Sequence, residues 1–208
     1  MKPVVLLTLL ALLLSACGSS KSLHENIFLY FTPNSLQTDK SLIKTATFPL
    51  KVQVRKLKIS PLYDNQNIVL RSGDYSVSFI RRAEWAVRPH QAASDMLIDY
   101  LKSHFQFKTV RESFSDDVPD LVISGEMKAV EEDGRTPSRS ATLILTLRAS
   151  LGREERLLFE ETYSKNLSVK KSGYDELAKT FSLALSDIYS AFSAHLEKSL
   201  AVAPERAQ

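Results

Sequence analysis

The sequence predicts one α/β domain, a mixed and largely antiparallel sheet packed by two long helices. Two stretches, residues 88–105 and 174–200, place apolar residues at helical spacing. Shorter segments before and between them alternate apolar and polar side chains, as strands with one buried face do. The chain has 208 residues and a single cysteine. An internal disulfide is therefore excluded, and the fold depends on burying an apolar core.

Residues 1–16 have the pattern of a bacterial lipoprotein signal peptide. Lys2 supplies the positive end, and an apolar run leads to the small residues Ser15-Ala16 and then to Cys17, the only cysteine. The run is shorter than the roughly 20 apolar residues that span a bilayer. Lipid attachment requires a nucleophilic thiol, so Cys17 is predicted to carry palmitate and further acyl chains that anchor the protein to a membrane.

The anchor also predicts where the protein works. Gly18 follows the cysteine, whereas an aspartate there often retains lipoproteins in the inner membrane. The predicted location is therefore the bacterial cell envelope, at the periplasmic face of the outer membrane. Residues 17–25 are small and polar and form a lipidated tether that reaches about 30 Å at most. The domain is predicted to occupy residues 26–200, followed by a disordered tail at 201–208.

Alternation of apolar and polar side chains predicts the strands. Residues 34–47 lack such a pattern and are predicted to form a loop. Within the hairpin over 67–80, the apolar residues Tyr75, Val77 and Phe79 share one face. The serines between them lie on the opposite face. The predicted strands are residues 26–31, 48–59, the hairpin over 67–80, 107–110, and an antiparallel meander of 120–130, 141–149 and 157–167.

The second strand contains a predicted β-bulge. Val52 and Val54 alternate in one parity, and Leu57 and Ile59 in the other, so the pattern slips by one residue across Arg55-Lys56. A slip of one residue turns the later side chains to the opposite face of a sheet. One extra residue at this point returns both apolar pairs to the same face.

The two helices have clear starting points. Pro89 suits the first turn of the helix at 88–105. Ser172 can cap the helix at 174–200, and Asp175 lies where a carboxylate interacts favourably with the helix dipole. Each helix carries an apolar stripe for the sheet. The stripe of the second helix is Leu177, Phe181, Leu185, Ile188, Phe192 and Leu196.

The sequence predicts no enzymatic activity, no metal site and no cofactor. Its histidines lack metal-ligand spacing. They are His24, His90, His104 and His195. A Gly-x-Ser-x-Gly elbow and a glycine-rich phosphate loop are both missing. Residues 131–137 are predicted to form a solvated hairpin loop, since Glu131, Glu132 and Asp133 stand beside Gly134 without a ligand pattern. The near balance of 27 basic and 24 acidic residues argues against nucleic acid as a partner.

Residues 81–85 are the candidate partner-binding segment. They contain the only tryptophan, Trp85, placed directly between a predicted strand and the first predicted helix. One interpretation is that Trp85 closes the end of the core while the charged neighbours stay in water. The other is a contact surface, because tryptophan and arginine are enriched at binding hot spots. The candidate contact residues are Arg81, Arg82 and Trp85.

From Leu50 to about Leu196, the chain resembles the ABC-type transport auxiliary lipoprotein family, also described as PqiC-like. The family has a proline and a tyrosine before an "x-I-V-x-R" strand, and a tryptophan just before its first long helix. Residues 87–90 depart from the Pro-Leu start that is usual there. The segments that carry the resemblance are Val52-Gln53-Val54, residues 60–64, residues 66–71, residues 82–86 and residues 174–177.

The resemblance implies a protein without enzymatic activity that serves an ABC system moving lipids in the envelope and so maintains membrane integrity. It implies an Mce-type periplasmic subunit as the protein partner and phospholipid as a further ligand. The protein is also expected to contact the membrane through its N-terminal lipid. Two alternatives stay open: a periplasmic lipid-binding module acting on its own, and an activator of cell-wall synthesis. Exposed sheet edges would also permit a homo-oligomer.

Overall fold

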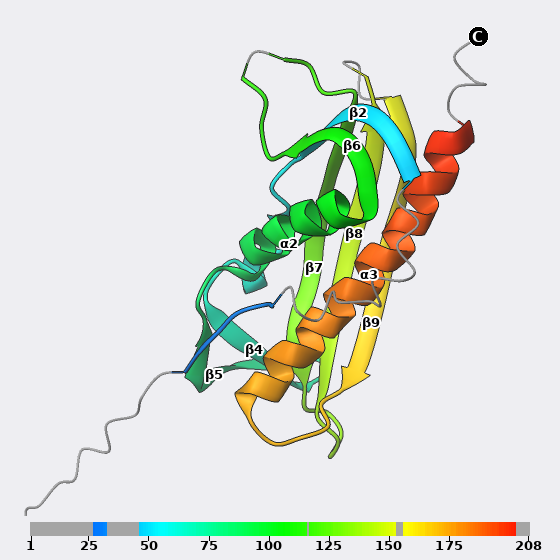
Figure 1. Cartoon of the computed structure of the whole chain (residues 1–208). Coiled ribbons are helices and arrows are strands. Elements are labelled where there is room, and N and C mark those ends of the chain that lie inside the picture. The colour runs from blue at the N-terminus through cyan, green and yellow to red at the C-terminus, as the bar shows by residue number, and fades with distance from the viewer. Residues whose placement is uncertain (1–26, 33–45, 116, 153–155, 203–208) are drawn as a thin grey trace, which may run out of the picture.

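The computed structural model describes residues 27–32, 46–115, 117–152 and 156–202 (Figure 1). The predicted signal peptide, Cys17 and the tether lie outside the described residues, as do most of the loop predicted at 34–47 and the last six residues. The described part contains nine strands, two α-helices and one short 3-10 helix. The helices are η3 (Pro61–Tyr63), α2 (Pro89–His104) and α3 (Tyr174–Val202).

All nine described strands belong to one mixed sheet with β7 at its centre. On one side of β7, β8 and β9 follow antiparallel and form the two longest ladders. Along its other edge, β2, β3 and β4 pair with it in turn, each in parallel. The strands are β1 (Ile27–Leu29), β2 (Ala46–Val54), β3 (Lys58–Ile59), β4 (Asn67–Gly73), β5 (Ser76–Trp85), β6 (Phe105–Arg111), β7 (Leu121–Asp133), β8 (Ser140–Leu151) and β9 (Arg156–Ser168).

Two branches extend from this centre. Strand β6 lies parallel beside β2, and the β4–β5 hairpin carries β1 in parallel on its far edge. The mixed α/β fold with two long helices is therefore confirmed, as are the hairpin and the meander. The short parallel pairings along β7 join segments that are far apart in the sequence.

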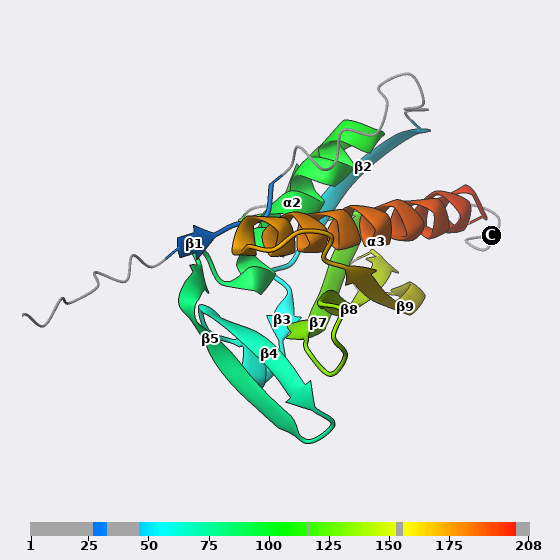
Figure 2. The same cartoon turned by 90° about the horizontal axis from the view of Figure 1, so that it is seen from below.

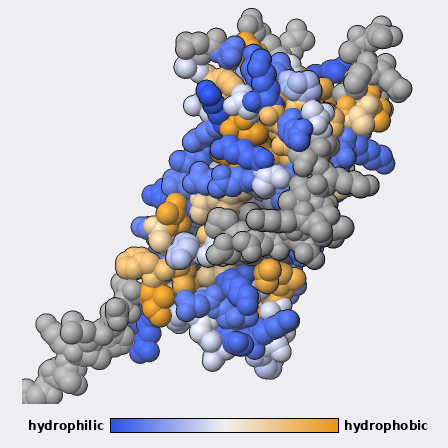
Figure 3. Space-filling view, viewed as in Figure 1, coloured by the Kyte–Doolittle hydropathy of each residue, from blue (hydrophilic) through white to orange (hydrophobic). Residues whose placement is uncertain are grey.

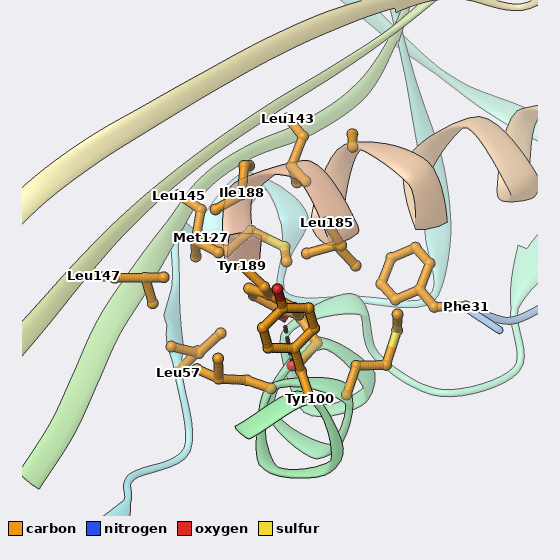
Figure 4. Close-up of a cluster of buried hydrophobic side chains, with 14 of the residues drawn as sticks. Phe31, Leu57, Tyr100, Met127, Leu143, Leu145, Leu147, Leu185, Ile188 and Tyr189 are labelled. Carbon is orange, nitrogen blue, oxygen red and sulfur yellow. Dashed lines mark hydrogen bonds between the residues drawn. The ribbon is translucent and has the colours of Figure 1, made fainter. Parts of the chain in front are cut away.

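The core lies between the helices and one face of the sheet. The predicted stripe of α3, from Leu177 to Leu196, is fully buried, and α3 lies diagonally along β7, β8 and β9 (Figure 1). The Tyr189 hydroxyl donates to the Ala93 carbonyl of α2 at 2.7 Å, which fastens the helices together. Figure 4 shows Tyr189 beside Tyr100, with leucines of β8 around them. Helix α3 ends at Val202, two residues beyond its predicted end.

The predicted β-bulge is present between β2 and β3. Val54 pairs with Ile123, and Lys58 pairs with Glu126. Between these two pairs, the segment that joins β2 to β3 has one more residue than β7. Val54 and Leu57 are both buried as a result. The Leu57 amide, displaced from the ladder, donates to Ser94 Oγ at 3.0 Å.

The prediction of a solvated loop at 131–137 is wrong for its first three residues. Strand β7 continues to Asp133, and Glu131, Glu132 and Asp133 are all buried. Three carboxylates in a row remain there because each of them forms an ion pair with an arginine. Gly134 follows the strand, and its amide donates to the Arg71 carbonyl at 2.9 Å.

Candidate partner-binding surface

The β4–β5 hairpin projects from the body of the molecule. Figure 2 shows both helices lying away from its turn. Only the last residues of β5 enter the core, where Ala83 and Trp85 are buried. The rest of β5 is exposed or half-buried. The hairpin therefore offers a surface that the described elements leave uncovered.

One face of this hairpin carries apolar side chains that are exposed to solvent. Val77 and Phe79 are 39% and 47% exposed, and Tyr75 in the turn is fully exposed. Arg81, two residues further along β5, is exposed as well. We call Tyr75, Val77, Phe79 and Arg81 the hairpin stripe. Single exposed apolar residues are common on proteins, but a continuous row indicates an interaction site.

The hairpin stripe and the buried end of β5 lie on opposite faces of the sheet. Val77 and Phe79 pair with Arg71 and Val69 of β4. From Phe79 to Glu84, β5 advances five residues while β4 advances only two, so the alternation of β5 shifts by an odd number of residues and Trp85 reaches the face of α3. The predicted common face of Val77 and Phe79 is present. The alternation did not reveal that this face lies away from α3, because alternation reports a face and not what covers it.

Trp85 lies in the core and is 1% exposed. Its ring centroid is 4.9 Å from that of Phe31 and 5.6 Å from that of Phe181 in α3. This burial supports the first interpretation of the sequence, a tryptophan that closes the end of the core. Arg81 and Arg82 are both exposed. A partner contact in this segment stays a prediction, and it falls on the arginines.

The hairpin is fastened to the sheet by a buried cluster around Glu131. Glu131 accepts from the Tyr63 hydroxyl at 2.6 Å and from Arg71 Nε and Nη2 at 2.5 and 2.9 Å. Burial and the neighbouring carboxylate raise the pKa of Tyr63 to about 12. The hydrogen bonds that Arg71 donates to Glu131 likewise raise the pKa of Arg71. At neutral pH a guanidinium and a phenol therefore face one carboxylate, and we call these three residues the Glu131 cluster.

A second contact holds the turn of the hairpin. Arg135 Nη2 donates to Asp133 at 2.7 Å, and its Nη1 donates to Asp74 in the β4–β5 turn at 3.1 Å. The bonds from Arg135 lower the pKa of Asp133 to about 2. With Arg71 in the middle of β4 and Asp74 at the turn, the hairpin is tied to the end of β7 at two points. The hairpin stripe is therefore presented in a defined orientation.

The sequence contained one signal for the Glu131 cluster. Tyr63 and Arg71 stand in the two segments that carry the proline, the tyrosine and the "x-I-V-x-R" strand of the family resemblance. The structure brings both side chains to the same carboxylate. Glu131 itself gave no signal, because its acidic neighbours and the following glycine favour a loop by composition.

The described residues offer little else for chemistry. Within them, no three histidine, cysteine, aspartate or glutamate side chains are arranged to hold a metal ion. His90 is buried, which lowers its pKa, and His195 lies 3.1 Å from the Tyr163 hydroxyl. Neither helix of the described part is long and apolar enough to cross a membrane.

Comparisons with known proteins agree on the fold. Protein XCC0632 from Xanthomonas campestris has a crystal structure that matches with a TM-score of 0.68 and 13% identity, covering 87% of this chain and 97% of that one. A crystal structure of an uncharacterized protein matches with a TM-score of 0.59 and 13% identity, covering 74% and 99%. At these identities the likeness shows the fold alone.

The family is identified by the sequence. No curated protein is significantly similar to the chain. The family model described as the ABC-type transport auxiliary lipoprotein component matches residues 34–191. This match covers the Glu131 cluster, the hairpin stripe and most of α3. The protein therefore belongs to the ABC-type transport auxiliary lipoprotein component family.

Proposed function

We propose that this protein is a non-enzymatic, membrane-anchored subunit that docks an Mce-type periplasmic subunit of an ABC lipid transport system. The hairpin stripe is the observation that carries the proposal, since it presents Val77 and Phe79 to solvent beside Arg81. The family description of a transport auxiliary lipoprotein supports the role of an accessory subunit. An exposed apolar row provides a surface for binding another protein and no groups for turnover of a substrate.

The geometry of the hairpin suits docking because little order has to be gained on binding. Association costs free energy whenever loops and side chains become fixed. Here the Glu131 cluster and the Asp74–Arg135 contact already fix the hairpin on the sheet. A central aromatic with a neighbouring arginine is the composition typical of binding hot spots. We therefore place most of the binding energy on Phe79 and Arg81.

A Phe79→Asp substitution is expected to lower recovery of the Mce-type subunit from solubilised envelopes by at least about tenfold. The new carboxylate would be desolvated in an apolar interface, and truncation at a hot spot alone costs about 2 kcal/mol or more. Co-purification with the tagged, anchored chain is the measurement. Leu157→Asp is the matched control, since Leu157 is 51% exposed at the start of β9, and that end of β9 lies far from the β4–β5 hairpin in Figure 1. Unchanged recovery with Phe79→Asp would contradict the docking role of the stripe.

The anchor on Cys17 contributes by confinement. Holding the protein in two dimensions raises the local concentration of the partner's site, so that a modest interface suffices. In a chain given an ordinary cleavable leader, Cys17→Ser is expected to move the protein from the membrane fraction to the soluble periplasm. The melting temperature should stay unchanged, because the substitution lies outside the described helices and strands. Fractionation with membranes despite the substitution would contradict lipid attachment at Cys17.

A further inference from the structure

The first strand presents a second apolar surface, where the described chain begins. Phe28 and Tyr30 are 58% and 62% exposed, whereas Leu29 and Phe31 between and after them are buried. Ile27 is exposed as well, at the start of the same strand. Figure 3 shows apolar side chains gathered at this corner of the molecule. We call Ile27, Phe28 and Tyr30 the β1 patch.

The β1 patch belongs to the outer strand of this branch of the sheet, and the hairpin stripe lies toward the turn of the hairpin. Strand β1 pairs with β5 so that Phe28 lies opposite Glu84 and Leu29 opposite Trp85. Paired residues of neighbouring strands share a face. Phe28 therefore stands on the face opposite to Trp85. The two surfaces are built by different strands, so each can be changed without altering a residue of the other.

We infer that the β1 patch lies on the bilayer to which the protein is anchored, with Phe28 and Tyr30 at the level of the lipid headgroups. The inference rests on the lipid anchor at Cys17 proposed above. Ile27 is ten positions after Cys17. A segment of this length spans at most about 35 Å. The patch is therefore held within reach of the membrane surface.

The composition of the patch fits the bilayer interface. Aromatic side chains are enriched at the headgroup level, where a ring is half in apolar surroundings and a tyrosine hydroxyl stays in water. A short tether gives a local concentration in the millimolar range, so even weak insertion is populated. Phe28 lies opposite Glu84 of β5, and Arg82 stands two residues before Glu84 in the same strand. The opposing charges indicate that insertion depends on the rings and little on anionic lipid.

The test uses the complete lipidated chain in vesicles of phosphatidylethanolamine and phosphatidylglycerol with brominated acyl chains. In a Phe28→Trp variant, the new indole is expected to be quenched several-fold more strongly than the fluorescence of the natural chain, whose Trp85 is buried. Leu157→Trp is the matched control. Leu157 is exposed to a similar degree at the start of β9, an end that lies far from β1 in Figure 1, and its variant should show no added quenching. The quenching of Phe28→Trp should persist when phosphatidylglycerol is left out.

The outcomes separate the patch from the anchor. Flotation of the vesicles reports the anchor, and a chain that fails to float overturns the anchor and this inference together. A chain that floats but shows no added quenching in Phe28→Trp, or equal quenching in Leu157→Trp, overturns this inference alone. If Phe28→Asp abolishes recovery of the transporter subunit while Tyr30→Trp remains unquenched, the patch is a protein interface and the inference is wrong.

Discussion

A Trp85→Ala variant is expected to have a free energy of unfolding about 3–5 kcal/mol lower than the natural chain. The indole is almost fully buried and contacts Phe31 and Phe181, so its removal leaves a cavity among three separate segments of the chain. A loss of this size is a large fraction of the stability of a typical domain. Unfolding in denaturant, followed by circular dichroism, measures it.

The same substitution decides between the two interpretations of the segment 81–85. Trp85→Phe keeps an aromatic ring against Phe31 and Phe181 and should retain most of the stability. If Trp85 acts only in the core, Trp85→Phe should also retain recovery of the partner subunit, whereas Arg81→Glu should lose it without a change in stability. Loss of the partner in a stable Trp85→Phe variant would instead assign the contact to the tryptophan.

Patterns that are local in the sequence predicted the corresponding parts of the fold well. The β-bulge at Arg55-Lys56 could be predicted because a slip of one residue changes which face is apolar. The stripe of α3 could be predicted because a helix repeats its buried face every three to four residues. In both cases the information lies within one strand or helix, so no knowledge of its neighbours was needed.

Pairings between distant segments could not be predicted in this way. Glu131 resembles a loop residue until Arg71 and Tyr63 are seen beside it, and they precede it by 60 and 68 positions. The parallel pairing of β4 with β7 has the same origin. The exposure of Val77 and Phe79 depends on which face of the sheet the helices cover. The candidate surface therefore had to come from the structure, although its alternation was visible in the sequence.

The Glu131 cluster predicts a coupling between stability and docking. Glu131→Gln is expected to lower the free energy of unfolding by about 3 kcal/mol. The substitution leaves the Arg71 guanidinium without its counter-charge, and that side chain is only 22% exposed. Because Arg71 belongs to β4, the loosened element should be the hairpin. Amide hydrogen exchange in β4 should accelerate more than exchange in β8.

Tyr63→Phe is the matched control for this substitution. It removes one hydrogen bond to Glu131 but leaves both bonds from Arg71, so the expected loss is about 1 kcal/mol. A double variant, Glu131→Leu with Arg71→Leu, should recover much of the stability, because an apolar pair replaces a buried ion pair at little cost. The double variant lacks the charges, so its stability would separate what the ion pair contributes to stability from what it contributes to the orientation of the hairpin.

The double variant also tests why the hairpin is held by charges. If orientation of the hairpin matters for docking, Glu131→Gln should weaken recovery of the partner subunit although every residue of the hairpin stripe is intact. A double variant that is stable but still fails to recover the partner would show that the ion pair sets the orientation, since stability alone would then be insufficient. Full recovery of the partner by Glu131→Gln, with accelerated exchange in β4, would contradict the coupling between the cluster and docking.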